Sequence, residues 1–189
     1  MSRNPPLAAR RPVNVDSRPV YQGHVVTLRV DTLRYPNGQE VKREIIDHPG
    51  AVVVAALDER GRVAVVEQYR PAVGRELFEL PAGTLENGED PAAAAVRELR
   101  EETGVEAARW DALGSFYSSP GFLCEELHAY LARDLREVPP QPEDDEDIEV
   151  SWMPLATSPV GRQSVMDSKT LATLFLVEDF LRREAAGGP

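Results

Sequence analysis

Three glutamates near the middle of the chain have a spacing suited to binding a cation. Glu98, Glu101 and Glu102 stand at positions i, i+3 and i+4, so on a helix their side chains fall within an arc of roughly 100°. Like charges at this spacing disfavour an isolated helix, whereas a divalent cation would neutralise them. Mg²⁺ prefers oxygen ligands and usually serves phosphate-bearing substrates. The spacing alone leaves two interpretations open, a cation site or a solvated acidic helix face with ordinary salt bridges.

The segment before these glutamates favours the cation site. Residues 83–89 form a glycine-bearing loop that ends with Glu89, just before the expected start of the helix. Arg97 stands next to the three glutamates and can pair with Glu101 at i, i+4. Loop and helix should therefore form one compact unit.

Residues 83–105 read GTLENGEDPAAAAVRELREETGV and resemble the Nudix box, G-x5-E-x7-R-E-U-x-E-E-x-G-U, where U is apolar. Every defined position of the box agrees, and these positions are Gly83, Glu89, Arg97, Glu98, Leu99, Glu101, Glu102, Gly104 and Val105. Agreement at every defined position over this length strongly indicates that the segment is a Nudix box. The chain is therefore identified as a member of the Nudix hydrolase family.

The resemblance implies an α/β fold, an α/β/α sandwich with a mixed β-sheet, in which the box forms a loop–helix–loop. It also implies hydrolysis of a nucleoside diphosphate linked to another moiety, with Mg²⁺ or Mn²⁺ as the cofactor. Bound metal ions neutralise pyrophosphate oxygens and activate a water molecule.

The resemblance further assigns roles to residues of the box. Its implied metal ligands are Glu98, Glu101 and Glu102, assisted by the main-chain carbonyl of Ala82 or Gly83. Arg97 and Glu89 would then be orienting residues that hold the glutamates and the loop.

Three further segments are similar to the ADP-ribose pyrophosphatase branch of the family: Gln68-Tyr69-Arg70, the ELPAG of residues 79–83 and the SPGF of residues 119–122. Pro120 follows Gly104 by sixteen residues, a spacing that in this branch marks ADP-ribose hydrolases, and an acid of the signature stands at Glu125. Cys124 departs from the pattern, because family members often carry an acid or an amide there. The implied reaction is Mg²⁺-dependent hydrolysis of the pyrophosphate bond of ADP-ribose to AMP and ribose 5-phosphate.

The catalytic base of such hydrolases is thought to be a glutamate in a loop that the acidic run of residues 143–149 resembles. Glu146 is the first candidate in this run, with Asp144 and Asp145 as neighbouring alternatives. Metal ions nearby would keep such a base ionised. A solvated acidic loop is the other interpretation of the same residues.

Several residues outside the box are candidates for substrate binding. Arg70 and Arg43 could each offer a fork of donors to the phosphates or the adenine edge, or could form surface salt bridges. Glu79 could contact metal or substrate, or anchor its loop. The branch motif adds Pro120, Gly121 and Glu125, although Ser-Pro-Gly is also a common turn sequence.

Two other functions compete with ADP-ribose hydrolysis. Another nucleoside diphosphate could be the substrate, with a sugar nucleotide such as GDP-mannose as the nearest competitor. The domain could also be an idle sensor that binds ADP-ribose, although an idle copy would be expected to have lost a box glutamate.

Composition narrows the classes of partner. The net charge of −11, from 21 basic and 32 acidic residues, disfavours general nucleic-acid binding. The longest apolar run covers residues 51–57, too short for a membrane span, and the N-terminus lacks the apolar stretch of a secretory signal. A single cysteine excludes an internal disulfide framework. We therefore expect a soluble cytoplasmic protein with no membrane partner.

The elements that position these residues follow from local patterns. Asp90, Pro91 and Gly104 suit the N-cap, the first turn and the stop of a helix over residues 90–104. Strands are expected over residues 25–35, 40–47, 51–57, 62–69, 112–117, 127–132 and 149–153, and a closing helix over residues 168–183. Loose segments are expected over residues 71–81 and 133–147.

The predicted organisation is one hydrolase domain over residues 21–184. A flexible N-terminal arm over residues 1–20 should precede it, because that segment is rich in Arg and Pro, and a frayed tail over residues 185–189 should follow. Members of the resembled branch commonly form homodimers that exchange N-terminal strands, so the resemblance also implies a homodimer.

Overall fold

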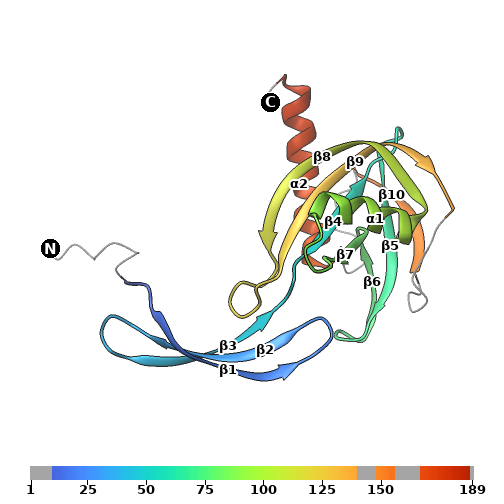
Figure 1. The fold of residues 1–189 in the computed structure, drawn as a ribbon. Helices are drawn as coiled ribbons and strands as arrows, with labels where there is room; N and C mark the ends of the chain where they lie inside the picture. Colours follow the sequence, from blue (N-terminus) through green and yellow to red (C-terminus); the bar gives the residue numbers. More distant parts are fainter. Residues whose placement is uncertain (1–9, 140–147, 156–166, 188–189) are drawn as a thin grey trace. The chain divides into compact units, whose positions relative to one another are not determined.

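The computed structural model describes residues 10–139, 148–155 and 167–187. The chain divides into two compact units, one with residues 1–49 and 119–125 and the other with residues 50–118 and 126–189. Figure 1 shows the elements of both units.

The sequence predicted a single domain over residues 21–184. Residues 119–125 group with the first unit because they pair with one of its strands: the Phe122 carbonyl accepts a hydrogen bond from the Ile46 amide at 2.7 Å, and the Cys124 amide donates to the Ile46 carbonyl at 3.1 Å.

The first unit is an antiparallel sheet of three strands in the order β1-β2-β3, namely Val13–Gln22, Thr27–Arg34 and Glu40–Asp47. β2 and β3 form the hairpin that Asn37-Gly38 predicted, and Gly38 has the positive φ of 85° that this turn requires. β1 occupies residues that the sequence assigned to a flexible arm. Its order comes from pairing along β2, a contact that the composition of the segment does not reveal.

The second unit contains a mixed sheet and a smaller antiparallel sheet. The mixed sheet has the order β7-β4-β9-β8, with bounds Ala82–Thr84, Ala51–Ala56, Glu126–Glu137 and Val105–Tyr117, and its β4 and β9 run parallel. The smaller sheet has the order β10-β5-β6, with bounds Ile148–Pro154, Arg62–Arg70 and Arg75–Glu79. Two helices complete the described part of this unit, α1 (Pro91–Thr103) and α2 (Ser168–Ala185).

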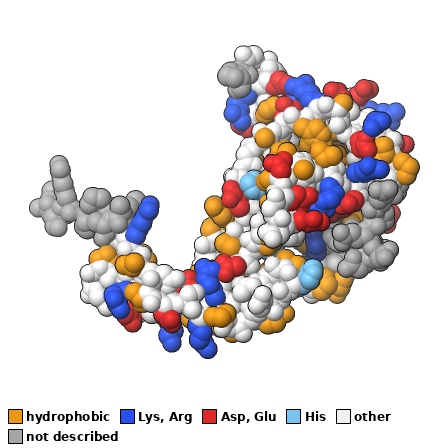
Figure 2. Space-filling view, in the orientation of Figure 1, with side chains coloured by type: hydrophobic (Ala, Val, Ile, Leu, Met, Phe, Trp, Pro, Cys, Tyr) orange, Lys and Arg blue, Asp and Glu red, His pale blue; other side chains and the backbone are white. Residues whose placement is uncertain are grey.

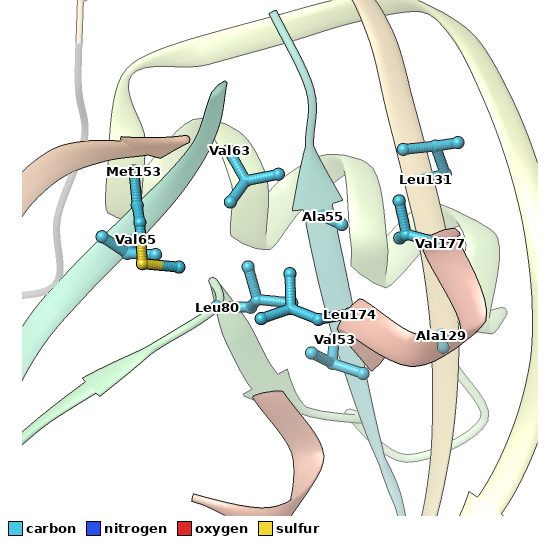
Figure 3. Packing of buried hydrophobic residues seen from close by; sticks show 10 residues of the cluster. All are labelled: Val53, Ala55, Val63, Val65, Leu80, Ala129, Leu131, Met153, Leu174 and Val177. Carbon is cyan, nitrogen blue, oxygen red and sulfur yellow. The ribbon is translucent and has the colours of Figure 1, made fainter. Parts of the chain in front are cut away.

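Every residue of β4 is buried, and its side chains alternate between two cores. Val53 and Ala55 belong to the cluster that includes Leu174 and Val177 of α2 (Figure 3). The alternate residues of β4 belong to a second cluster, with Ala94, Ala95 and Leu99 of α1. Because the two helices pack on opposite faces of the same strand, this unit is the expected α/β/α sandwich.

The helix that carries the glutamates forms where its caps predicted. The Asp90 side chain accepts a hydrogen bond from the Ala93 amide at 3.1 Å, and Pro91 begins the helix. Gly104 ends it in the left-handed conformation, with a φ of 63°. These two caps fix which residues of the box belong to α1.

Local patterns located most of the other elements but not all of their bounds. β6 lies in the segment predicted to be loose, and β9 extends to Glu137, beyond the predicted end at residue 132. Both additions are held by a neighbouring strand, β5 and β8 respectively. Among the described residues, no helix combines the length and apolar character needed to cross a membrane.

Candidate active site

The three glutamates of α1 line one cavity of the second unit. The cavity has a volume of about 270 Å³. Acidic and basic side chains gather on the face of this unit that carries α1 and β7 (Figure 2). The cavity is bordered by residues of β5, β7, α1 and the loop between them, namely Gln68, Arg70, Ala82, Gly83, Thr84, Glu86, Arg97, Glu98, Glu101 and Glu102. Residues that sequence reasoning took from the box and from the Gln68-Tyr69-Arg70 segment therefore share one site.

Arg97 connects the loop of the box to two of the glutamates. Its Nε and Nη2 donate to the two carboxylate oxygens of Glu89, each at 3.0 Å. Its Nη1 donates to Glu98 at 2.8 Å and to Glu101 at 3.0 Å. The hydrogen bond from Arg97 holds the pKa of Glu89 below its ordinary value, and the same contact raises the pKa of Arg97. All three carboxylates around Arg97 are thus oriented by one permanently charged group.

Two residues of β7 also contact the box glutamates. A Cβ atom added to Gly83 would collide with the carboxylate of Glu98, so a side chain at this position would displace that carboxylate. The Ala82 amide donates to Glu102 at 3.2 Å. Glu98 and Glu102 are both 7% exposed, although ionised carboxylates are rarely buried unless they are paired. Their burial indicates a built site and argues against a solvated helix face.

Glu79 does not line the cavity, and its contacts match the anchoring interpretation. Arg70 Nε and Nη2 donate to its two oxygens at 2.8 and 2.7 Å, and Lys169 contacts the second of these oxygens. Burial would raise the pKa of Glu79, but the contacts with Arg70 and Lys169 outweigh burial and lower it. Glu79 is therefore a buried anion that holds two cations.

The remaining predicted residues belong to the first unit or fall outside the described residues. Arg43 belongs to the first unit, where it lines a cavity of about 680 Å³ together with Phe122. Pro120, Gly121 and Glu125 also belong to that unit, and Glu125 lies 3.8 Å from His48. Glu146 and its neighbours Asp144 and Asp145 lie outside the described residues.

Sequence reasoning did not find Lys169 and Asp167, which complete the ion pairs around Glu79. Lys169 donates to Asp167, the N-cap of α2, at 2.5 Å. No local signal could have found this contact, because Lys169 is 90 residues away from Glu79 in the chain.

The donors of the α1 cavity suit a hard divalent cation. The three box glutamates border the same space as Glu86, Ala82 and Gly83, and oxygen donors are what Mg²⁺ prefers. Within the described residues, no three acidic, histidine or cysteine side chains are gathered closely enough to form a complete metal cluster. Arg97 supplies the positive charge that balances Glu98 and Glu101 in this arrangement.

Comparison with known proteins identifies the class to which this fold and site belong. Residues 47–172 match the model of the NUDIX domain, so the chain belongs to the Nudix family.

Individual relatives extend the similarity over most of the chain. An ADP-ribose pyrophosphatase from Bacillus subtilis (strain 168) is 42% identical over 155 residues, which cover 80% of this chain and 84% of that protein. A methanol dehydrogenase activator from Bacillus methanolicus is 41% identical over 161 residues, covering 83% of this chain and 87% of that protein. A solved structure described as an ADP compounds hydrolase covers 93% of this chain and 96% of its own, with a TM-score of 0.82 and 20% identity, and it supports the fold.

Proposed function

We propose that this protein hydrolyses the pyrophosphate bond of ADP-ribose to AMP and ribose 5-phosphate, with Mg²⁺ as the cofactor. The observation that carries the proposal is that the three box glutamates and Arg70 border one cavity. The similarity to a protein named ADP-ribose pyrophosphatase supports the choice of substrate. The name of the other relative, a methanol dehydrogenase activator, does not define a chemical reaction, so it does not alter that choice.

In this proposal Glu98, Glu101, Glu102 and the Ala82 carbonyl hold Mg²⁺, and Mn²⁺ is an alternative. When bound, the metal neutralises phosphate oxygens and lowers the pKa of a bound water. The role of Arg97 is to orient Glu98 and Glu101, and the role of Glu89 is to fix Arg97 to the loop. The contacts of Arg97 with all three carboxylates support both roles.

Arg70 is the proposed contact for a substrate phosphate, because its guanidinium borders the cavity and always carries a positive charge. The roles of the remaining residues are proposed from the resemblance to the ADP-ribose pyrophosphatase branch. Glu146 is proposed as the catalytic base, and Arg43, Pro120, Gly121 and Glu125 are proposed as substrate contacts. Glu79 acts through Arg70 and does not contact the substrate in this proposal.

A substrate panel tests the function. Purified protein with Mg²⁺ is incubated with ADP-ribose, GDP-mannose and other nucleoside diphosphates, and the products are separated by chromatography. AMP and ribose 5-phosphate should form fastest from ADP-ribose. Faster turnover of another diphosphate would refute the substrate assignment and keep the Nudix chemistry, whereas binding of ADP-ribose without any turnover would favour the sensor.

We also propose that the protein is a cytoplasmic homodimer. The first unit supports the dimer, because it is a three-stranded sheet in which the whole of β1 is exposed. Apolar side chains exposed along such a strand are suited to packing against a second copy of the chain.

A further inference from the structure

The ion pairs of Glu79 join α2 to the cavity lined by α1. The Glu79 side chain is 2% exposed, and it contacts two cations from distant parts of the chain, Arg70 of β5 and Lys169 of α2. A buried carboxylate is stable only when it is paired and hydrogen-bonded. Both cations are therefore part of what keeps Glu79 ionised in its place.

Arg70 is the partner that reaches the cavity. Its Nε and Nη2 are both engaged by the two oxygens of Glu79, in the bidentate geometry that fixes the plane of a guanidinium. Nη1 is not used by Glu79. The orientation of the Arg70 side chain, and with it the direction of its remaining donors, thus follows the orientation of the Glu79 carboxylate.

Lys169 holds that carboxylate from α2, because it contacts the same oxygen of Glu79 that accepts from Arg70 Nη2. Its side chain is 13% exposed and is held between Glu79 and Asp167, the N-cap of α2. The residue that follows it, Thr170, accepts a hydrogen bond from the Leu80 amide at 2.9 Å. The first turn of α2 is therefore fixed against the chain segment that contains Glu79. Lys169 itself does not border the cavity.

We infer that Lys169 is a positioning residue for substrate binding: it fixes the Glu79 carboxylate, which in turn fixes the Arg70 guanidinium at the cavity. This inference rests on the proposed function in one respect, that Arg70 contacts a substrate phosphate. Without Lys169, the second oxygen of the Glu79 carboxylate keeps only its hydrogen bond from Arg70, so the carboxylate is no longer held from α2 and can rotate. Arg70 then loses its bidentate partner and presents its charge to the phosphate in many orientations.

A double-mutant cycle on the kinetics of ADP-ribose hydrolysis tests the inference. Lys169→Met should raise KM about tenfold, a usual effect of losing a supporting contact, with a smaller change in kcat. Arg70→Ala should raise KM by more than Lys169→Met does. Adding Lys169→Met to Arg70→Ala should raise KM no further, because the residue through which Lys169 acts is gone.

Thr173→Val is the matched control. It changes a fully buried residue of the same helix that takes no part in the ion pairs of Glu79, so it should leave KM within twofold of the wild-type value. A Lys169→Met variant with unchanged KM, or one that raises KM by the same factor with and without Arg70, would overturn the inference. If Lys169→Met does not fold, Lys169→Gln replaces it in the same cycle, since it removes the positive charge that pairs with Glu79 while keeping a polar side chain at that position.

The test separates failure of the inference from failure of the proposed function. If the wild-type protein hydrolyses another diphosphate instead of ADP-ribose, the same double-mutant cycle is measured with that substrate. A wild-type protein that hydrolyses none refutes the proposed function. The cycle is then measured on the dissociation constant of inorganic pyrophosphate by calorimetry, where additive effects overturn the inference and non-additive effects support it.

Discussion

Arg97 is the residue around which the acidic groups of the site are arranged. It donates to Glu89, Glu98 and Glu101, so one side chain balances much of the negative charge that the box collects. Glu102 is held by a different group, because the Ala82 amide donates to its carboxylate at 3.2 Å. The glutamates are therefore supported in different ways, and their substitution should have different effects.

For Glu102 we expect a loss of catalysis without a loss of fold. Glu102→Gln is nearly isosteric and keeps an oxygen that can accept from the Ala82 amide, but it removes the charge proposed to bind Mg²⁺. Turnover of ADP-ribose should fall about 10²–10³-fold, the effect of removing one electrostatic contact in an active site. Steady-state kinetics and thermal unfolding measure the two quantities. An unfolded variant, or one with unchanged turnover, would contradict the assigned role.

The contact between Gly83 and Glu98 gives a prediction about stability. Gly83→Ala should be destabilising, because the added methyl group occupies the position of the Glu98 carboxylate. Glu98→Ala removes that carboxylate. Gly83→Ala should therefore lower the unfolding free energy much less when Glu98→Ala is also present. Urea unfolding of the two single variants and the double variant measures the coupling. An equal loss of unfolding free energy in both backgrounds would show that the collision with Glu98 is not the reason why Gly83→Ala is destabilising.

At the scale of elements, α2 is fixed to the sheet by its first turns. Thr170 and Thr173 are both fully buried on this helix, but only the hydroxyl of Thr170 has a hydrogen-bond partner, the Leu80 amide. Thr170→Val should cost about 1–3 kcal/mol of unfolding free energy, because it leaves that buried amide unsatisfied. Thr173→Val is the control, and it should be neutral or stabilising because it removes an unpaired buried hydroxyl. Chemical denaturation of both variants checks the contrast, and equal costs would contradict it.

The ion pairs of Glu79 should make the attachment of α2 dependent on pH. Its pKa in the folded protein is lowered, so its contribution to stability is present above the unfolded pKa of about 4.3 and is lost as the pH falls through the folded value. Between pH 7 and pH 3, the wild-type protein should therefore lose more unfolding free energy than Glu79→Gln. Urea unfolding at a series of pH values measures both curves. Parallel curves would show that Glu79 is not the group that titrates.

At the scale of the whole molecule, the exposed apolar residues of β1 predict that two copies of the chain form a dimer. Val13, Val15 and Val20 are 66%, 40% and 51% exposed, an unusual proportion for one strand of a folded protein. Sedimentation should give twice the mass of one chain, and Val13→Lys with Val15→Lys should shift the protein toward a monomer. Phe175→Lys, which changes an exposed residue of α2 in the other unit, is the control and should not alter the mass. A monomeric wild-type protein would contradict the proposed dimer.

The sequence by itself determined the elements whose signals are local. The caps Asp90 and Gly104 define α1, the Asn37-Gly38 turn defines a hairpin, and the apolar run of residues 51–57 defines the buried β4. It also determined which box residues share a site, because a helix fixes the relative positions of side chains three and four residues apart. The family and its chemistry followed from the same short stretch.

Only the tertiary structure decided the features that depend on contacts between distant residues. β1 is ordered by β2, although its composition predicted a flexible arm. Helical spacing paired Arg97 with Glu101 and the resemblance made Arg97 and Glu89 orienting residues, whereas the structure shows that Arg97 donates to Glu89 and Glu98 as well. The sequence left Glu79 as either a ligand or an anchor of its loop, and its buried ion pairs with Arg70 and Lys169 favour the anchor. Periodicity and capping describe interactions over a few residues, whereas a buried carboxylate takes its partners from whichever segments the fold brings to it.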